Sequence, residues 1–236
     1  MTSIQSSFDP DLRKTIRTKK QAVIIPVGSL EQHGPHLPVS TDSDIVTEVA
    51  KRVAKKCSLL LLPTITYGVS FEHAPFFNLS VTKATLQNQL VDICRSLGEN
   101  KVRKIIILNG HHGNQEALSG VADKISKESG GRNKVFVISY WHHMGREFDH
   151  AGFVETSLML ATSDNVRMSR ARKGLVIDKM SPKQKSKTSK LASTHFIRAT
   201  KTGVWGDPTR ATKKEGETIL TEIGRNIAKK VSKLPY

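Results

Sequence analysis

Residues 104–114 have the sequence KIIILNGHHGN, and the first five of them form the clearest buried strand in the chain. The apolar residues of this run are consecutive rather than alternating, which is typical of a strand covered on both faces of a parallel sheet. The run leads directly into Asn109 and Gly110. Residues 115–126 then show the pattern of a helix that follows the strand.

The same alternation of short apolar runs and helical periodicity extends over most of the chain. Strands are predicted at residues 22–27, 59–62, 104–108 and 135–140, and helices at 44–56, 82–97, 115–126, 153–161 and 213–231. This order favours parallel βαβ units with right-handed crossovers and a sheet covered on both faces. We therefore predict an α/β fold in one domain, residues 1–236, with a polar N-terminal segment (1–20) and a mobile loop at 179–201.

The composition is strongly basic, with 37 Lys and Arg against 21 Asp and Glu, a formal net charge of +16. Such an excess would suit a nucleic-acid partner. The charge is spread over four runs without a neighbouring aromatic motif, at residues 51–56, 101–104, 183–190 and 229–233. Solvated faces are therefore the favoured interpretation, and an anionic small substrate would profit from the same field.

Neither a membrane location nor an oxidising, disulfide-forming compartment is expected. No run of about 18 apolar residues predicts a membrane span, and the N-terminus lacks the apolar core of a signal peptide. Cys57 and Cys94 stand outside any CxxC pattern, so neither a disulfide framework nor a thiolate metal site is predicted. A reducing, cytoplasmic compartment is the expectation.

Ligands of such sheets bind beyond the carboxyl ends of the strands, so the loops after residues 27, 108 and 140 are the place to search. The first loop, GSLEQHGPHLPVSTD (28–42), contains Glu31 and His33 on the same side of an extended chain, followed by Asp42. Imidazole and carboxylate without thiolate suit zinc, manganese or iron. A polar loop of ordinary turn residues is the alternative for this motif alone.

The second loop, NGHHGN, has His111 and His112 with Asn114, which is also a candidate helix N-cap. The third, DHAGFVETS (149–157), has two further acids and an imidazole, although Glu155 alone could be an acid in a first helical turn. Together the three clusters indicate two metals and a proton shuttle. Four isolated histidines are left outside the site: His73, His142, His143 and His195.

Four motifs resemble, in the same order, those of the creatininase (creatinine amidohydrolase) family: GSLEQHGPHLPVSTD, IIILNGHHGN, DHAGFVETSLML and RATKKEGETIL. The resemblance extends from Val23 to about Leu220. It implies a three-layer αβα sandwich with a mostly parallel central sheet. It also implies a homo-oligomer, often a hexamer, and two divalent metal ions (Zn, Mn or Fe) in each subunit.

Carried over by position, the resemblance implies that Glu31, Asp42 and His111 hold one metal. His33 and the shared Asp42 would hold the other. Creatininase completes its second metal with a glutamate two residues past the ligating histidine, where this chain has Gly113.

Glu155 is the expected replacement for that glutamate. His150 falls at the position of the family's catalytic histidine, with Asp149 as the acid beside it. We expect Asp149 or Glu155 to orient the attacking water and His150 to protonate the departing nitrogen.

Two departures concern the substrate. His112 replaces a tyrosine, and Arg146 replaces the tryptophan that closes over creatinine. A cation in place of an aromatic lid favours an anionic substrate, such as the formamidopyrimidine ribosyl phosphate that other family members deformylate. Asn114 is expected to position a ligand or the substrate carbonyl.

The predicted function is therefore metal-dependent hydrolysis of a non-peptide amide or formamide C–N bond in a small molecule, with that deformylation as one candidate reaction. Creatinine ring opening is the alternative within the same class. A basic nucleic-acid-binding protein and a structural metal protein without catalysis are the alternatives from other classes.

Overall fold

A five-stranded parallel sheet with the strand order β1-β3-β2-β4-β5 lies at the centre of the computed structural model, which describes residues 2–19 and 22–235. The strands are β1 (Thr2–Ser3), β2 (Val23–Val27), β3 (Leu60–Leu61), β4 (Lys104–Asn109) and β5 (Lys134–Ser139). The predicted parallel α/β sheet is confirmed.

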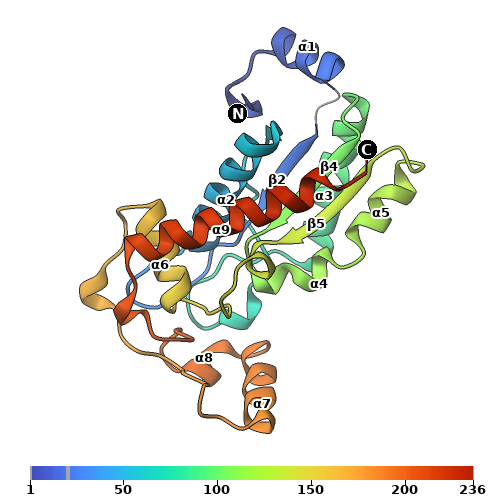
Figure 1. Ribbon diagram of the computed structural model, residues 1–236. Coiled ribbons are helices and arrows are strands. Elements are labelled where there is room, and N and C mark those ends of the chain that lie inside the picture. Colours follow the sequence, from blue (N-terminus) through green and yellow to red (C-terminus); the bar gives the residue numbers. More distant parts are fainter. Residues whose placement is uncertain (1, 20–21, 236) are drawn as a thin grey trace.

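Helices cover both faces of this sheet (Figure 1). One layer contains α2 (Thr41–Cys57), α6 (Phe153–Thr162) and α9 (Lys213–Ser232), and the other contains α3 (Lys83–Glu99) and α5 (Val121–Glu128). In β4, Ile106 and Leu108 pack in the first layer's core, whereas Ile105 and Ile107 pack in the second. Successive side chains of a strand point to opposite faces, so an unbroken apolar run is what two covered faces require. The three-layer sandwich is thereby confirmed.

The remaining elements are short or lie at the ends of the molecule. The helices are α1 (Asp9–Lys19), α4 (Gln115–Leu118), α7 (Pro182–Ala192) and α8 (Phe196–Thr200). The 3-10 helices are η1 (Ile4–Ser6), η2 (Phe71–His73), η3 (His112–Asn114), η4 (Tyr140–His143), η5 (Met168–Arg170) and η6 (Pro208–Arg210). The helix predicted at 115–126 is divided into α4 and α5, because Gly120 between them adopts a positive φ of 73°.

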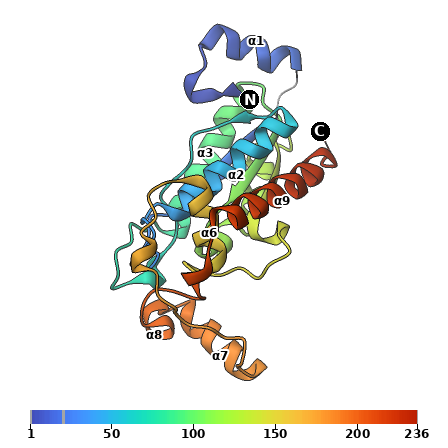
Figure 2. The same cartoon turned by 60° about the vertical axis from the view of Figure 1, so that its left-hand side comes forward.

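The segment predicted as a mobile loop, 179–201, forms α7 and α8, so that prediction is wrong. Ser181 accepts a hydrogen bond from the backbone of Gln184, whose side chain accepts one from the Ser181 N–H, and Pro182 follows at the first helical position. This capping box starts a helix that has too few apolar residues for helical periodicity to be visible. Both views place α7 and α8 at the opposite end of the molecule from α1 (Figures 1 and 2).

Among residues 2–19 and 22–235, no helix combines the length and the apolar character that crossing a bilayer requires.

Candidate active site

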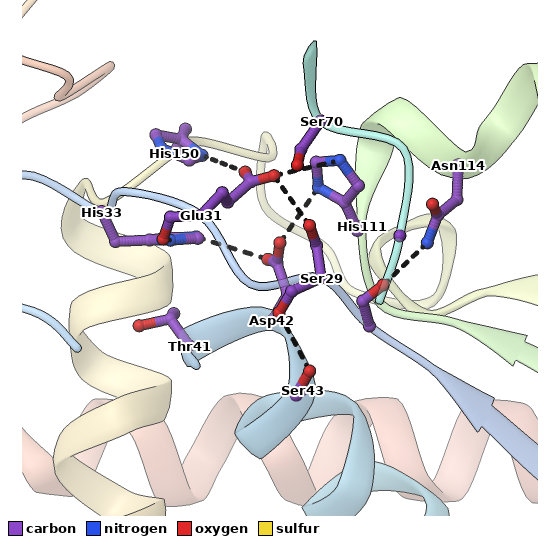
Figure 3. A network of polar contacts seen from close by, with 12 residues as sticks. Ser29, Glu31, His33, Thr41, Asp42, Ser43, Ser70, His111, Asn114 and His150 are labelled. Atoms are coloured by element: carbon purple, nitrogen blue, oxygen red, sulfur yellow. Dashed lines mark hydrogen bonds and ion pairs between the residues drawn. The ribbon is translucent and has the colours of Figure 1, made fainter. Parts of the chain in front are cut away.

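Five acidic and imidazole side chains converge at the carboxyl ends of β2 and β4. Glu31 and His33 belong to the loop after β2, and Asp42 lies in the first turn of α2 (Figure 3). His111 lies between β4 and η3, and Glu155 lies in the first turn of α6. None of the five is more than 4% exposed. The neighbouring positions of β2 and β4 in the parallel sheet bring the first two loops together.

Two groups of these side chains that share Asp42 could each hold a cation, and a third group joins Glu31 and His33 with His150. Glu31, Asp42 and His111 each offer one ligand atom within 4.8 Å of the others, and so do His33, Asp42 and Glu155. Asp42 belongs to both groups. Its Oδ1 lies 3.3 Å from His33 Nε2, and its Oδ2 lies 3.0 Å from His111 Nδ1. A carboxylate shared in this way is suited to bridge two cations.

Backbone carbonyls select the ring nitrogen that each histidine presents to the site. His111 Nε2 lies 2.9 Å from the Val69 carbonyl oxygen, and His33 Nδ1 lies 3.1 Å from that of Glu31. A ring N–H donated to each carbonyl leaves His111 Nδ1 and His33 Nε2 facing Asp42. Histidines that bind metals are oriented in this manner, by a hydrogen bond from the other nitrogen.

The buried atoms of the cluster fit divalent cations. Glu31 Oε1, His33 Nε2, Asp42 Oδ2 and Glu155 Oε1 are buried and form no hydrogen bond among the described residues, although imidazole–carboxylate contacts of 3.0–3.3 Å join the first three to neighbouring side chains of the cluster. A buried carboxylate oxygen without a hydrogen bond costs more than the roughly 1–3 kcal/mol of an unpaired neutral group. A cation at each site would satisfy these atoms, and the mixed imidazole and carboxylate donors suit zinc, manganese or iron.

The pKa shifts of the histidines in the cluster reflect the negative electrostatic potential of its carboxylates. Burial lowers the pKa of His33, but the carboxylates of Asp42, Glu155 and Glu31 outweigh burial and raise it to about 10. The pKa of His111 also rises to about 10, against burial, because of Glu31 and Asp42. Burial raises the pKa of Asp42, yet the two imidazoles lower it well below its usual range. The site therefore needs positive charge, which protons provide when cations do not.

Asp149 and His150 lie beside the cluster in different roles. Asp149 accepts hydrogen bonds from the backbone N–H groups of Val154 (2.8 Å) and Glu155 (3.2 Å), so it caps the start of α6. Burial raises the pKa of Asp149 to about 7 despite these bonds. His150 Nε2 lies 3.0 Å from the Gln32 carbonyl oxygen, and its Nδ1 lies 3.8 Å from Glu31 Oε1. Burial and the neighbouring imidazoles lower the pKa of His150 well below its ordinary value.

Two residues of η2 also lie at the site: Glu72, which the sequence pattern did not indicate, and His73, which was expected to lie outside it. His73 is buried, with Nε2 3.1 Å from Glu31 Oε1 and Nδ1 2.9 Å from Gln32 Nε2. Glu72 Oε1 lies 3.9 Å from His111 Nε2. The acid-histidine pair at 72–73 follows β3, which neighbours β2 in the sheet, so the rule of carboxyl ends could have identified it.

Gly113 has no room for the family's glutamate. A Cβ at this position would lie 2.6 Å from Glu72 Oε1 and closer still to the Val69 carbonyl oxygen. The carboxylate that lies near position 113 is instead that of Glu72. Glu155 completes the candidate group with His33 and Asp42. The backbone thus excludes a longer residue at 113.

The three residues expected to bind substrate are placed differently from one another. Asn114 is fully buried, accepting from Val69 N–H (2.9 Å) and donating to the Gly28 carbonyl (3.0 Å), so it ties loops together and does not line the pocket. Arg146 lines the pocket, but its Nη2 lies 2.6 Å from Glu215 Oε2. His112 lines the pocket against the rings of Trp141 and Phe148.

The pocket has a volume of about 670 Å³, and the cluster forms its floor. Its other walls come from the segments 146–154, 175–178 and 205–207 and from α7 and α8. The helices that replace the predicted loop therefore help to enclose the site.

The fold is that of solved creatininases. A crystal structure of creatinine amidohydrolase superposes with a TM-score of 0.82 and 26% identity, covering 98% of this chain and 96% of that one. A manganese form (TM-score 0.82, 25% identity, 98% and 97% covered) and a Zn–Zn form of a mutant creatininase (0.79, 25%, 97% and 96%) are similarly close. Creatininase structures thus contain divalent metals.

The sequence matches the family described as "Creatininase: Creatinine amidohydrolase" over residues 7–231. A mycofactocin precursor peptide peptidase of Mycobacterium ulcerans is 32% identical over 90% of this chain and 85% of its own length. Creatinine amidohydrolase of Pseudomonas putida is 33% identical over 59% and 63%. A 2-amino-5-formylamino-6-ribosylaminopyrimidin-4(3H)-one 5'-monophosphate deformylase of Methanosphaera stadtmanae is 37% identical over 45% and 46%.

Proposed function

The chain belongs to the creatininase family and is an amidohydrolase, and on this premise we propose that it uses two divalent cations to hydrolyse a C–N bond in a small-molecule amide. The pair of ligand groups that share Asp42 is the observation that supports two cations. Glu31 and His111 would hold the first, His33 and Glu155 the second.

Bound cations would supply two things, a water of lowered pKa, from ~15.7 towards ~7, and polarisation of the amide carbonyl. The chain's own residues would do the rest. His150 Nε2 lies 3.0 Å from the Gln32 carbonyl oxygen and 3.2 Å from the Gln32 amide nitrogen. In the tautomer protonated at Nε2, His150 donates to the carbonyl and its Nδ1 lone pair faces Glu31. With its lowered pKa, His150 is neutral and can accept the water's proton at Nδ1 and then return it to the departing nitrogen. Asp149 would act as a positioning residue, because its carboxylate holds the turn between His150 and Glu155.

Two observations bear on the bond that is cleaved. The relatives matched over about 90% of this chain are described as precursor peptide peptidases, which supports an amide bond of a precursor peptide as a second candidate for the cleaved bond. The deformylase match covers 45% of the chain, and the guanidinium of Arg146, the expected phosphate ligand, is paired with Glu215. Deformylation therefore has less support from the site than the sequence alone indicated.

A homo-oligomer is also proposed, since large apolar side chains lie exposed beside the site. They are Val39, Tyr67, Phe71, Phe76, Phe77 and Leu79, each 37–56% exposed. Backbone hydrogen bonds from Glu31 to Val39 and from Gln32 to Phe77 bring the two loops together. Exposed apolar side chains on two loops joined in this way would suit a protein interface, and they are called the apolar patch below. These two loops also carry Glu31 and His73, so assembly would be linked to the site.

Elemental analysis of the purified protein, followed by a substrate panel, tests the function. We expect close to two divalent ions per chain and metal-dependent release of an amine from at least one substrate among creatinine, the formamidopyrimidine ribosyl phosphate and short peptides. Metal-replete protein that hydrolyses no amide would contradict the proposal. Salt-dependent binding of DNA or RNA without any need for metal would favour the basic nucleic-acid-binding alternative.

A further inference from the structure

The charge of the pocket is opposite to that of the whole chain. Eight lining residues are Asp or Glu, and Arg146 is the single Lys or Arg among them. The carboxylates outside the proposed metal ligands and Asp149 are Glu72, Glu147, Asp178 and Asp207. Glu72 lies beside the cluster at the floor, and the other three form the outer part of the wall, the rim (Glu147, Asp178 and Asp207). Since Arg146 is paired with Glu215, the rim stays acidic even when cations neutralise the floor.

Two of these rim carboxylates are available to a ligand. Glu147 and Asp178 are exposed, and neither forms an ion pair with any described residue. Asp207, by contrast, accepts hydrogen bonds from the backbone and hydroxyl of Thr209. The segment 179–206 has seven Lys and Arg and no acid, yet the residues by which it lines the pocket are uncharged or aromatic: Ser189, Ala192, Ser193, Phe196 and Trp205, with Gly206. Its cations are therefore not part of the pocket wall.

The wall between rim and floor is apolar. Phe148, Leu175, Ile177 and Trp205 are half-buried around the pocket. Phe196 of α8 reaches the floor, with its ring centroid 4.6 Å from those of both His73 and His150. An apolar group placed here would be removed from water on several sides, at roughly 25 cal/mol per Å² of apolar surface buried.

From this arrangement we infer that the substrate has an apolar group next to the scissile amide, has no negative charge there, and is bound more tightly when a cationic amine or guanidine reaches Glu147 and Asp178. The inference rests on the proposed function, because it assumes that the bond is cleaved at the pocket floor. The expected substrate class is therefore a neutral or cationic amide with an apolar side group. A phosphate-bearing substrate is not expected in this pocket.

Hydroxamates test the inference without the unknown substrate, since a hydroxamate binds divalent metal and projects its side group into the pocket. Isothermal titration calorimetry of the metal-loaded chain would compare acetohydroxamate, benzohydroxamate, 4-(aminomethyl)benzohydroxamate and 4-carboxybenzohydroxamate. We expect benzohydroxamate to bind on the order of tenfold more tightly than acetohydroxamate. The aminomethyl compound should bind on the order of tenfold more tightly than the carboxy compound.

Variants then assign the effect to residues. Glu147→Gln with Asp178→Asn should reduce the preference for the aminomethyl over the carboxy compound to about threefold or less and leave the affinity for benzohydroxamate unchanged. Phe196→Leu should weaken benzohydroxamate but not acetohydroxamate. The matched control is Asp123→Asn, an acid on α5 outside the pocket, which should change nothing.

The outcomes separate the two proposals. A carboxy compound that binds as tightly as the aminomethyl one, or a preference that survives the double variant, would overturn the inference while leaving the metal site intact. Protein that takes up no metal, or that binds no hydroxamate, acetohydroxamate included, would overturn the proposed function and the inference with it.

Discussion

Replacement of Asp42 by asparagine tests the central feature of the site. Asp42 is 2% exposed, and its two carboxylate oxygens lie 3.0 Å and 3.3 Å from the nitrogens of His111 and His33. It is the one residue common to the two proposed ligand groups. Asp42→Asn keeps the size of the side chain but removes the charge and one of the two acceptor oxygens, so both cations should lose affinity together.

The expected size of the effect follows from linkage between binding and folding. A cation present at 100 times its dissociation constant stabilises the folded chain by about 2.7 kcal/mol, so two sites contribute about 5 kcal/mol. For a domain of 150–250 residues, each kcal/mol raises the Tm by roughly 2–4 °C. Metal should therefore raise the Tm of the wild-type chain by about 10–20 °C and that of Asp42→Asn by only a few degrees.

Differential scanning calorimetry with and without metal, together with elemental analysis, measures both quantities. Asp44→Asn is the matched control, since Asp44 lies in the same turn of α2 and accepts from the Ser40 hydroxyl, outside the cluster. It should keep full metal content and the wild-type shift. An Asp42→Asn protein with two bound ions and an undiminished shift would refute the shared-carboxylate site.

Three further predictions concern the pH dependence of stability, the role of Asn114 and the exposed apolar side chains. The pKa of His33 and His111 in the metal-free chain is about 10 instead of 6.5, so the folded state binds more protons than the unfolded one between these values. Metal-stripped protein should thus be less stable at pH 10 than at pH 6.5, and an unchanged urea midpoint would contradict this. Asn114→Ala should cost about 2–4 kcal/mol in urea unfolding by leaving two buried backbone groups unpaired, whereas Asn78→Ala, at a more accessible position, should cost little. Phe77→Asp should lower the molar mass measured by light scattering if the apolar patch joins subunits, and an unaltered assembly would exclude it.

The layers of the fold could be predicted because the physical signal is local. Ile105–Leu108 forms an unbroken apolar run, and a strand with two covered faces requires one. Helix α7 could not be found in this way, because its stability at the start depends on the capping box of Ser181 and Gln184 and not on an apolar stripe. A search for caps as well as periodicity would have found it.

Local sequence patterns also fail to predict the contacts of some single residues of the site. Convergence of Glu31, Asp42 and His111 follows from their places after neighbouring parallel strands. The role of Asn114 depends on which backbone groups lie opposite its amide, which spacing along the chain does not encode. The partner of Arg146, Glu215, is likewise 69 residues away, so the charge of the pocket could not be read from one cation or from the net charge.

The order of the proposed metal ligands along the chain has a consequence for biosynthesis. Glu31, Asp42 and His111 are all present once the first half of the polypeptide has been translated, whereas Glu155 lies on a helix made later. A nascent chain can therefore offer donors to one ion well before the other can be accommodated. Metal availability during translation would then influence the folding of the amino-terminal half of the sheet as well as the activity of the folded enzyme.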